Sequence, residues 1–460
     1  MPRIHKQSPI NIQQVGTGDS GNTAVALRMD SVRSRVLHKL QVISDMGHQQ
    51  QHPGPESIFL AALETGNLNL VQLLGSRHAN CVLKIRGEEM GYQVQTPARF
   101  GLTGLWTLEY TQELTSPLCI TASHGYTECV RYLLHRRADP NAAPGGRSPL
   151  HEACIGGHDT CVQLLLEHGA NPNHRSDDGL APLHLCDTKD SLRCAEILLQ
   201  HGALLNQPTE ATQDTPLHIA ARLGLFGHVR LYLRCGANIN TKNIDGETPL
   251  ISACGGKWDN EDTCLQLCSL LLEKGADPEA QDHQERRPLH HACRKAEHKL
   301  VELLLKHDVD VNATDYNGVL PLSCVLQNAE LYREKRPQCT VRALLNHGAR
   351  SVCPEAFGKV LHCCSGLPEV IALLYNSYVN LLACSRWRQD IPEDQFQTHR
   401  SFYTTLFNVS GGVRSLQHLC RFTLRKHFGA RCQQFIPLLP VPTVIKDYLL
   451  LASERGNCLL

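Results

Sequence analysis

A repeated Pro-Leu pair constrains the fold of this 460-residue chain more than any other feature. The typical step between successive pairs is 33 residues, and the fifth unit holds about six extra residues around positions 257–263. After each pair come an Ala- or Cys-containing stretch, an apolar block and a Gly-Ala or its variant. A period of this length is typical of a solenoid. The seven pairs begin at Pro117, Pro149, Pro182, Pro216, Pro249, Pro288 and Pro321.

Each unit contains residues that can begin two helices, form their apolar faces and end them. A proline in the first helical turn gives up no backbone hydrogen bond, and a preceding residue such as Ser148 can cap the helix. In the second helix, Leu165 and Leu166 follow Val162 by three and four residues, which predicts an amphipathic face. Gly169 can then end that helix, and Asp-Gly or Asn-Gly tips reverse the chain. We therefore expect antiparallel helix pairs joined by β-hairpin-like turns.

These units resemble the ankyrin repeat, whose Thr-Pro-Leu-His-x-Ala signature is complete at residues 215–220. Ile251 and Ser323 replace the histidine of the signature, and the third unit lacks its mid-repeat Gly-His, so we expect irregular units there. A degenerate earlier unit is expected at residues 57–74. The resemblance implies a structural role, hydrogen bonding to neighbouring turns, for His151, His184, His218 and His290.

Two segments interrupt or precede the repeats. Residues 75–113, which contain Trp106 and Tyr110, either pack across the stack or form a partly ordered loop. Near the N-terminus, residues 24–43 have an amphipathic helical pattern in surroundings typical of disorder. The predicted domains are an N-terminal segment at 1–54, the degenerate unit with the insertion at 55–114, the repeats at 115–350, a helical cap and linker at 351–410, and a C-terminal module at 411–455.

Composition and charge narrow the function. The 45 basic residues equal the 45 acidic ones, so no strong field favours nucleic acid or an anionic membrane. The first ten residues are polar, and no apolar run approaches the roughly 20 residues that span a bilayer. We expect an intracellular, cytoplasmic protein, with the nucleus left open as a second compartment. Its 21 cysteines are then expected as thiols, of which Cys154, Cys254 and Cys293 occupy one repeat position as core fillers.

The pattern changes after residue 415. An apolar stripe recurs at helical spacing, Ser415 is a natural N-cap and Gly429 can end the helix. The prolines of residues 436–442 favour an extended segment, and residues 444–449 form a last short apolar face. Fewer than 40 residues cannot bury all these faces internally, so a partner surface is expected. The stripe consists of Leu416, Leu419, Cys420 and Leu424.

Leu416, Cys420 and Leu424 match the elongin-binding box of SOCS-box proteins, and residues 439–442, Leu-Pro-Val-Pro, match the cullin-5 box. Ankyrin repeats followed by these boxes resemble the ankyrin repeat and SOCS box protein family. The resemblance implies that the stripe formed by Leu416, Leu419, Cys420 and Leu424 binds elongin C. It also implies that the proline segment favours cullin-5 over cullin-2. The implied cullin-binding residues are Ile436, Leu439, Pro440, Val441, Pro442, Ile445 and Tyr448.

The implied function is a substrate receptor of an elongin B/C–cullin-5–RING ubiquitin ligase that directs a target to the proteasome. Such an adaptor needs no cofactor or metal and performs no chemistry; it supplies proximity. The alternative is an ankyrin scaffold outside any ligase, whose C-terminus only caps the stack. The predicted target contacts lie at or near the turn tips on the concave side: His174, Arg175, Lys242, Asn243, Asp245, His283, Asp315 and Tyr316.

Two clusters of His and Cys residues have the residue types of a metal or catalytic site, but we favour a structural role for both. Cys264 and Cys268 near His283 lack the second ligand pair of a zinc site, so core packing is the simpler interpretation. His290, His291 and Cys293 combine a base with a thiol, but His290 is the repeat histidine. Neither cluster predicts an enzyme.

Overall fold

We describe a computed structural model of the chain. The structure describes residues 55–75, 79–88, 110–256, 260–382, 384, 386–410, 412 and 414–452. The chain divides into two units, Met1–Ile58 and Phe59–Leu460, and the second holds nearly all of the described residues. The amphipathic pattern at residues 24–43 and Trp106 lie outside the described residues.

Helix pairs recur along the second unit, which confirms the predicted helical solenoid. The first member of each pair begins at or next to the proline in most units, since proline fits the first helical turn. The first members are α2 (Pro55–Glu64), α4 (Pro117–Ser123), α6 (Pro149–Gly156), η2 (Pro182–Leu185), α9 (Pro216–Leu223), α11 (Pro249–Gly255), α13 (Pro288–Arg294), α15 (Pro321–Asn328) and α17 (Phe357–Cys363). The second members are α3 (Leu68–Gly75), α5 (Thr127–His135), α7 (Asp159–Glu167), α8 (Leu192–Gln200), α10 (Phe226–Arg234), α12 (Glu261–Glu273), α14 (His298–Leu305), α16 (Pro337–Asn346) and α18 (Pro368–Tyr375).

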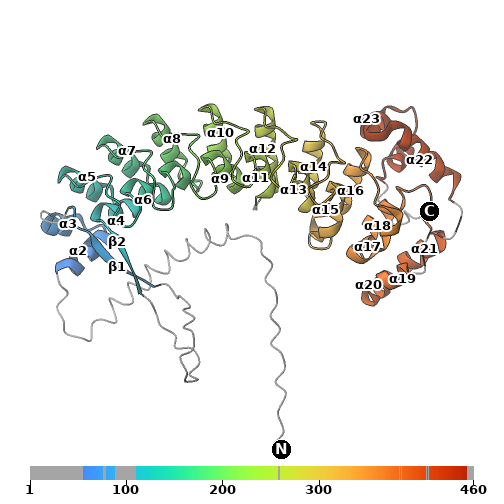
Figure 1. Cartoon of the computed structure of the whole chain (residues 1–460), viewed down its shortest axis with the longest axis horizontal. Helices are drawn as coiled ribbons and strands as arrows, with labels where there is room; N and C mark the ends of the chain where they lie inside the picture. The colour runs from blue at the N-terminus through green and yellow to red at the C-terminus, as the bar shows by residue number, and fades with distance from the viewer. Residues whose placement is uncertain are drawn as a thin grey trace, which may run out of the picture. The chain divides into compact units, whose positions relative to one another are not determined.

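The pairs stack in two rows with the core between them. First helices contact first helices from α4 to α17, second helices contact second helices from α3 to α18, and the row of first helices lies on the inner side of the arc (Figure 1). Fully buried leucines fill the space between the rows, including Leu150, Leu165 and Leu217. The thiols of Cys154, Cys254 and Cys293, which share one repeat position, are also buried, as expected of core fillers.

The third unit is irregular, as its missing Gly-His predicts. Its first helix is reduced to the 3-10 turn η2, which ends at Leu185. Every other first helix between α4 and α15 has seven or eight residues. The turn keeps the apolar contacts of its unit, because Leu183 and Leu185 remain buried.

The signature histidines tie each unit to the next. In His151 the Nδ1 atom accepts from the backbone N–H of Ser148 at 3.2 Å, and Nε2 donates to the Leu180 carbonyl of the following turn at 3.0 Å. His184, His218 and His290 make the same kind of bond to a later turn. Burial lowers the pKa of all four, that of His151 to about 4. They are neutral structural groups, which confirms the role implied by the resemblance.

Turn amides form a second set of ties. Asn141 Nδ2 donates to the Gly169 carbonyl at 3.1 Å, and its Oδ1 accepts from the N–H of Asn171 at 2.8 Å. Asn312 makes the equivalent pair of bonds to Gly348 and Arg350 further along. Because each bond crosses a unit boundary, the turns fix the spacing of the stack.

Two strands, which the helical prediction did not include, form within the insertion and at its end. β1 (Leu83–Glu88) pairs antiparallel with β2 (Tyr110–Thr115), with Leu83 opposite Thr115 and Glu88 opposite Tyr110. The predicted packing or ordering of the residues between them lies outside the described part of the chain. The turn tips between units close with backbone bonds, such as Asn243 N–H to the Glu247 carbonyl and Gly246 N–H to the Asn243 carbonyl, both at 3.0 Å.

Further helices, some short and some longer than α18, complete the chain after it. Aromatic rings join this region to the stack, with Phe357 and Trp387 centroids 5.0 Å apart and the Tyr403 hydroxyl donating to the Ser365 carbonyl at 2.6 Å. No helix among the described residues is long and apolar enough to cross a membrane. The remaining elements are η3 (Arg333–Lys335), η4 (Pro354–Ala356), α19 (Trp387–Asp390), α20 (Glu393–Thr398), α21 (Arg400–Ser410), α22 (Leu416–Phe428), η5 (Gly429–Arg431), α23 (Cys432–Phe435), η6 (Ile436–Leu438) and α24 (Thr443–Leu449).

Candidate functional site

Helix α22 carries the predicted apolar stripe. Its N-cap is Ser415, whose side chain accepts from the N–H of His418 at 3.3 Å, and it ends at Gly429 in a positive-φ conformation (φ 55°). Both ends therefore match the sequence prediction. Lys426 occupies the last turn, where its positive charge offsets the partial negative charge of the helix C-terminus.

The stripe points away from the protein. Leu416 is 77% exposed, and Leu419 and Leu424 are 37% and 38% exposed. Cys420, on the same face, is an exposed free thiol. A contiguous apolar helix face left in water marks an interaction surface, since burying a large apolar side chain contributes roughly 1.5–3 kcal/mol.

The opposite face of α22 is polar and buried, the reverse of an ordinary surface helix. His418 Nε2 donates to the Tyr378 carbonyl at 2.8 Å, and its Nδ1 accepts from Arg421 Nη2 at 2.9 Å. A carbonyl can only accept, so this histidine is the neutral Nε2–H tautomer. Burial lowers its pKa, which is consistent with that state. The Arg421 guanidinium also lies 4.3 Å from the Tyr448 ring centroid of α24.

Arg425 makes the most contacts across this interface. Its Nη1 donates to Asn346 Oδ1 at 2.6 Å and to the Leu449 carbonyl at 2.8 Å, and Nη2 donates to the Leu345 carbonyl at 3.0 Å. Asn346 Nδ2 in turn donates to the Leu450 carbonyl at 2.9 Å. We call Asn346, His418, Arg421 and Arg425 the polar clamp. It joins the last repeats to α22 and α24 through buried, charge-assisted bonds.

Beyond α22 the chain forms a small core of its own. Cys432, Ile436 and Leu449 are buried together, with Leu439 packed against them. Around this core Leu438 is 77% exposed, Val444 76% and Phe435 37%. Val444 belongs to the apolar face predicted at residues 444–449, whereas Phe435 and Leu438 enlarge the apolar surface beyond the predicted residues. These two lie in α23 and η6, which are too short for a helical period to stand out in the sequence.

The residues predicted to bind a cullin fall into three groups. Pro440, Pro442 and Ile445 are exposed, while Leu439, Val441 and Tyr448 are half-buried. Ile436 is fully buried in the small core, so it supports the segment from inside and does not reach a partner. The fully extended conformation expected for residues 436–442 is also corrected. Residues 436–438 form the 3-10 turn η6, because Pro437 fits its first turn, and extended backbone begins only at Leu439.

The predicted target contacts divide into exposed and anchored side chains. Lys242, Asp245, His283 and Tyr316 are exposed, Tyr316 to 75%. Asn243, by contrast, is only 6% exposed. Its Oδ1 accepts from the N–H groups of Asp245 and Glu247 and its Nδ2 donates to Asp214. Asn243 is therefore held inside the fold by its own turn and the preceding one, and it is not available as a surface contact.

Three further predicted contacts already have partners in the fold. Asp315 Oδ1 accepts from the N–H groups of two residues of its own turn, at 2.9 and 2.8 Å. Arg175 pairs with Glu210 at 3.2 Å, and the His174 ring lies 5.9 Å from that of His151. These side chains shape the tips, whereas the exposed four remain candidates for contact.

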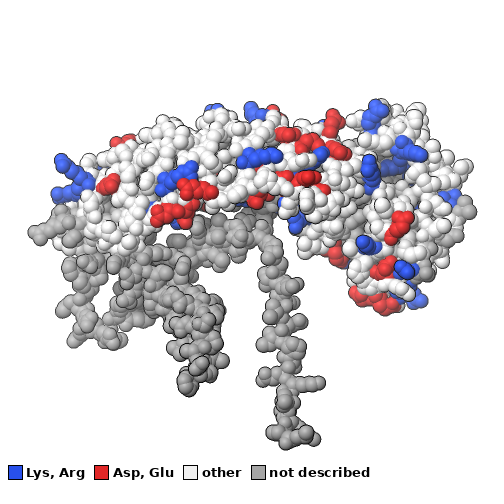
Figure 2. Space-filling model, viewed as in Figure 1, with Lys and Arg blue, Asp and Glu red and all other residues white. Residues whose placement is uncertain are grey.

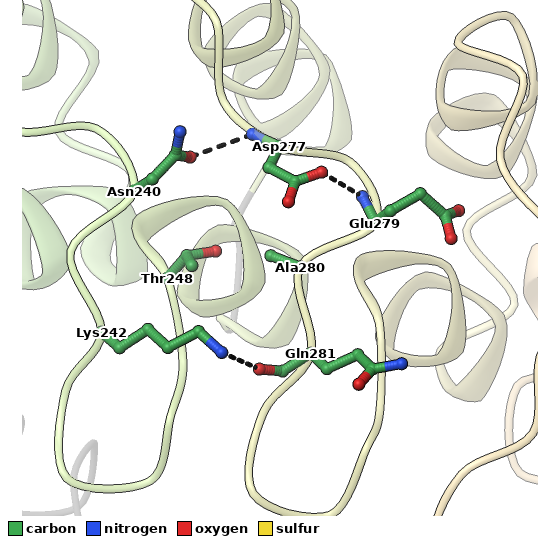
Figure 3. A pocket seen from close by; sticks show the side chains of 7 residues that line it. All are labelled: Asn240, Lys242, Thr248, Asp277, Glu279, Ala280 and Gln281. Atoms are coloured by element: carbon green, nitrogen blue, oxygen red, sulfur yellow. Dashed lines mark hydrogen bonds between the residues drawn. The ribbon is translucent and has the colours of Figure 1, made fainter.

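A shallow polar pocket opens beside Lys242 (Figure 3). It has a volume of about 270 Å³ and lies between two successive turns. Lys242 Nζ donates to the Gln281 carbonyl at 2.8 Å across one side, and Asn240 Oδ1 accepts from the N–H of Asp277 at 3.0 Å across the other. The Lys242 ammonium is thus partly engaged in holding the turns together. Both signs of charge are interspersed over the face of the array shown in Figure 2.

The two predicted alternatives can also be located. Cys264 and Cys268 are buried in α12, while His283 is exposed at a turn tip. Among the described residues no group of three or more His, Cys, Asp or Glu side chains is arranged to hold a metal ion.

Comparison with known proteins identifies both halves of this architecture. Ankyrin repeats match in three copies, at residues 29–176, 173–243 and 217–315, and the SOCS box matches residues 412–450. Human ankyrin repeat and SOCS box protein 18 is 54% identical over 378 residues, covering 82% of this chain and 81% of that protein. The chain belongs to the ankyrin repeat and SOCS box protein family.

Other members of the family align over similar lengths. Mouse ankyrin repeat and SOCS box protein 16 is 37% identical over 85% of both chains, and human protein 10 is 46% identical over 76% of both. Among solved structures, the ankyrin repeat domain of human ASB11 is 26% identical with a TM-score of 0.43, covering 48% of this chain and 96% of that one. In general terms, a SOCS box implies elongin B/C and a cullin-type ligase as partners, and ankyrin repeats imply a bound substrate. The family therefore supports a substrate-adaptor role in a cullin–RING ligase.

Proposed function

We propose that this chain is the substrate receptor of an elongin B/C–cullin-5–RING ubiquitin ligase and that its targets are degraded by the proteasome. The observation that carries the proposal is the reversed polarity of α22. A helix that buries His418 and Arg421 while exposing Leu416 and Leu419 is stable in place only because its polar side is satisfied. Its apolar side is then free to be covered by elongin C.

The remaining roles follow from this docking. The exposed Pro440 and Pro442 give the cullin segment little freedom to lose on binding, which favours association. The repeats hold the target, and the RING partner with a conjugating enzyme carries out ubiquitin transfer, so the chain itself contributes proximity and no chemistry. A cytoplasmic location is part of the proposal. Every described cysteine is a free thiol, as suits a reducing compartment.

Co-expression with elongin B and elongin C tests the ligase assignment. The unmodified chain should elute with both elongins in gel filtration, and Leu416→Gln combined with Cys420→Gln should release them. Lys426→Gln, at the edge of the same helix, is the matched control and should keep them. Circular dichroism should show unchanged helix content in all three proteins. An unmodified chain that runs alone as a stable, monodisperse protein would favour the scaffold alternative.

Cullin choice is tested with the purified elongin complex. Immobilised complex should capture cullin-5 in preference to cullin-2 from an equimolar mixture. Pro440→Ala with Pro442→Ala should weaken capture of cullin-5, because the segment becomes more flexible before docking. Equal capture of the two cullins by the unmodified chain would contradict this part of the proposal.

A further inference from the structure

A second pocket lies on the row of first helices, between α13 and α15 and the two turns that precede them. Its volume is about 320 Å³, roughly ten times the 30 Å³ that a water molecule occupies in the liquid. It is large enough for a side chain of a bound protein. Its lining includes Gln284, Arg286, Arg294, Asp315, Cys324 and Gln327.

One wall of this pocket is an arginine held by a buried carboxylate. Arg286 Nε donates to Asp282 Oδ2 at 2.9 Å, and His291 Nε2 lies 3.2 Å from the same oxygen. The Asp282 side chain is 1% exposed, whereas that of Arg286 is 24% exposed. Burial would raise the pKa of Asp282, but the bonds from His291 and Arg286 outweigh it and bring the pKa to about 2. The negative charge is thus kept behind the pocket and the guanidinium at its surface.

Arg294 supplies a second guanidinium that is not neutralised. It is exposed at the end of α13, and the structure gives it no hydrogen bond or salt bridge to another described residue. Near it, burial raises the pKa of the Cys324 thiol to about 11, so this thiol adds no negative charge. A guanidinium that ends in a polar pocket without a partner is suited to an incoming anion.

The acidic group in the lining is largely committed to the fold. Asp315 Oδ1 accepts from the N–H groups of Asn317 and Val319 at 2.9 and 2.8 Å. Arg286 is paired with Asp282 behind the wall, so Arg294 is the guanidinium of this lining that has no ion-pair partner among the described residues. Exposed amides at Gln284 and Gln327 add neutral hydrogen-bonding groups. Tyr316 extends from the same turn as Asp315 and is 75% exposed. Its backbone N–H donates to the carbonyl of Gln284, a residue of the lining, at 2.9 Å. Tyrosine and arginine are both enriched at binding hot spots.

We propose that this pocket, which we call the Arg294 pocket, receives an anionic side chain of the target, with Arg294 and Arg286 as its partners and Tyr316 packing on the flanking residue. The anion is a carboxylate or a phosphate monoester, since both accept the paired donors of a guanidinium. The inference rests on the proposed function, because it names the chemistry of the target that the repeats present to the ligase.

Three fluorescein-labelled twelve-residue peptides test the pocket, with the full chain in complex with elongin B and elongin C. One alternates Glu and Ser, one alternates Gln and Ser, and one alternates Gln and phosphoserine. In fluorescence polarisation at low salt, at least one anionic peptide should bind at least about tenfold more tightly than the Gln-Ser peptide, as expected for a charge-assisted contact. Tighter binding of the Glu or of the phosphoserine peptide tells which of the two anions the pocket takes.

Charge reversal at Arg294 and at a control arginine completes the experiment. Arg294→Glu should weaken binding of the anionic peptide by about tenfold or more. The control is Arg230→Glu, which makes the same charge change at an exposed position on α10 in the row of second helices. It should change the affinity by less than about twofold. Equal losses in the two variants would overturn the proposal. So would equal binding of the Gln-Ser and anionic peptides, or no saturable binding of either anionic peptide below about 1 mM. Elongin co-elution, measured on the same samples, reports separately on the proposed function.

Discussion

The repeat array and the C-terminal module bury opposite kinds of side chain. In the repeats, apolar side chains such as Leu165 and Leu217 are fully buried, and the polar residues of the turns point to solvent or tie one unit to the next. In α22 the apolar residues are exposed, and His418 and Arg421 are buried. The array is complete by itself, whereas the module has a surface that only another protein can complete.

This difference separates stability from function along the chain. Substitutions in the core of the array should act on folding first, and on binding only through it. Those on the exposed stripe of α22 should act on binding with little change in folding. The polar clamp lies between these extremes, because it is buried but polar and joins the two regions.

The largest expected effect is in the core of the array. Leu165→Ala should lower the free energy of unfolding by about 2–5 kcal/mol, because the leucine is 0% exposed and its removal leaves a cavity between the rows. Urea denaturation followed by circular dichroism measures it. Leu416→Ala, at a 77% exposed position, is the matched control and should change the unfolding free energy by less than about 0.5 kcal/mol.

A smaller loss is expected at the polar clamp. Arg425→Met keeps the aliphatic stem but leaves the oxygens of Asn346, Leu345 and Leu449 without this donor, at a cost on the order of 2–3 kcal/mol. Faster hydrogen exchange in α22 and α24 measures the loosened attachment. Elongin binding should persist, while ubiquitination of a bound target slows. Arg425→Lys should restore part of the protection, and unchanged exchange in the methionine variant would show that the clamp is not what holds the module.

Acidification should weaken the array through its buried histidines. The folded-state pKa of His151, about 4, is below its unfolded value of about 6.5, so the unfolded chain binds more protons as the pH falls below 6.5. Stability is therefore intact at pH 7 and decreases towards pH 5, by on the order of 1–2 kcal/mol for this histidine alone. Urea midpoints at pH 7 and pH 5 measure the loss. His151→Gln should reduce this pH dependence.

The smallest expected effect is on the exposed turn tips. Tyr316→Ala should leave the unfolding free energy within about 0.5 kcal/mol of the unmodified chain, because its side chain is 75% exposed. Combined with charge reversal of Lys242 and Asp245, it should lower ubiquitination of a bound target without affecting elongin or cullin binding. Full target capture by this triple variant would move the recognition surface away from the central tips.

The period of the sequence was sufficient to predict the stacked helix pairs, because proline and the apolar stripes act locally. Residues 351–410 are predicted as a helical cap and linker, and within that range α17 and α18 continue the stack as a further helix pair. The pairing of β1 with β2 was not predictable, because it joins two segments of the insertion that are far apart in the sequence. Periodicity detects neighbours along one helix but not contacts between distant segments.

The same limit applies to the sites. The stripe and the N-cap of α22 follow from residues within one helix, so they could be read from the sequence. Asn346 lies 79 residues before Arg425, and nothing in the local pattern of either residue indicates that they meet. Asn243 is predicted as a target contact because it lies at a turn tip, but its burial beside Asp214 depends on the neighbouring turn.

The polar clamp has a geometric consequence for catalysis by the proposed ligase. If α22 cannot rotate against the last repeats, the array and the C-terminal module form one rigid body. The distance from the target to the ubiquitin donor is then set by the number of repeats between them. The lysines of the target would then be selected by reach as well as by reactivity. A chain with one additional repeat inserted between the Arg294 pocket and α18 should ubiquitinate different lysines of the same target.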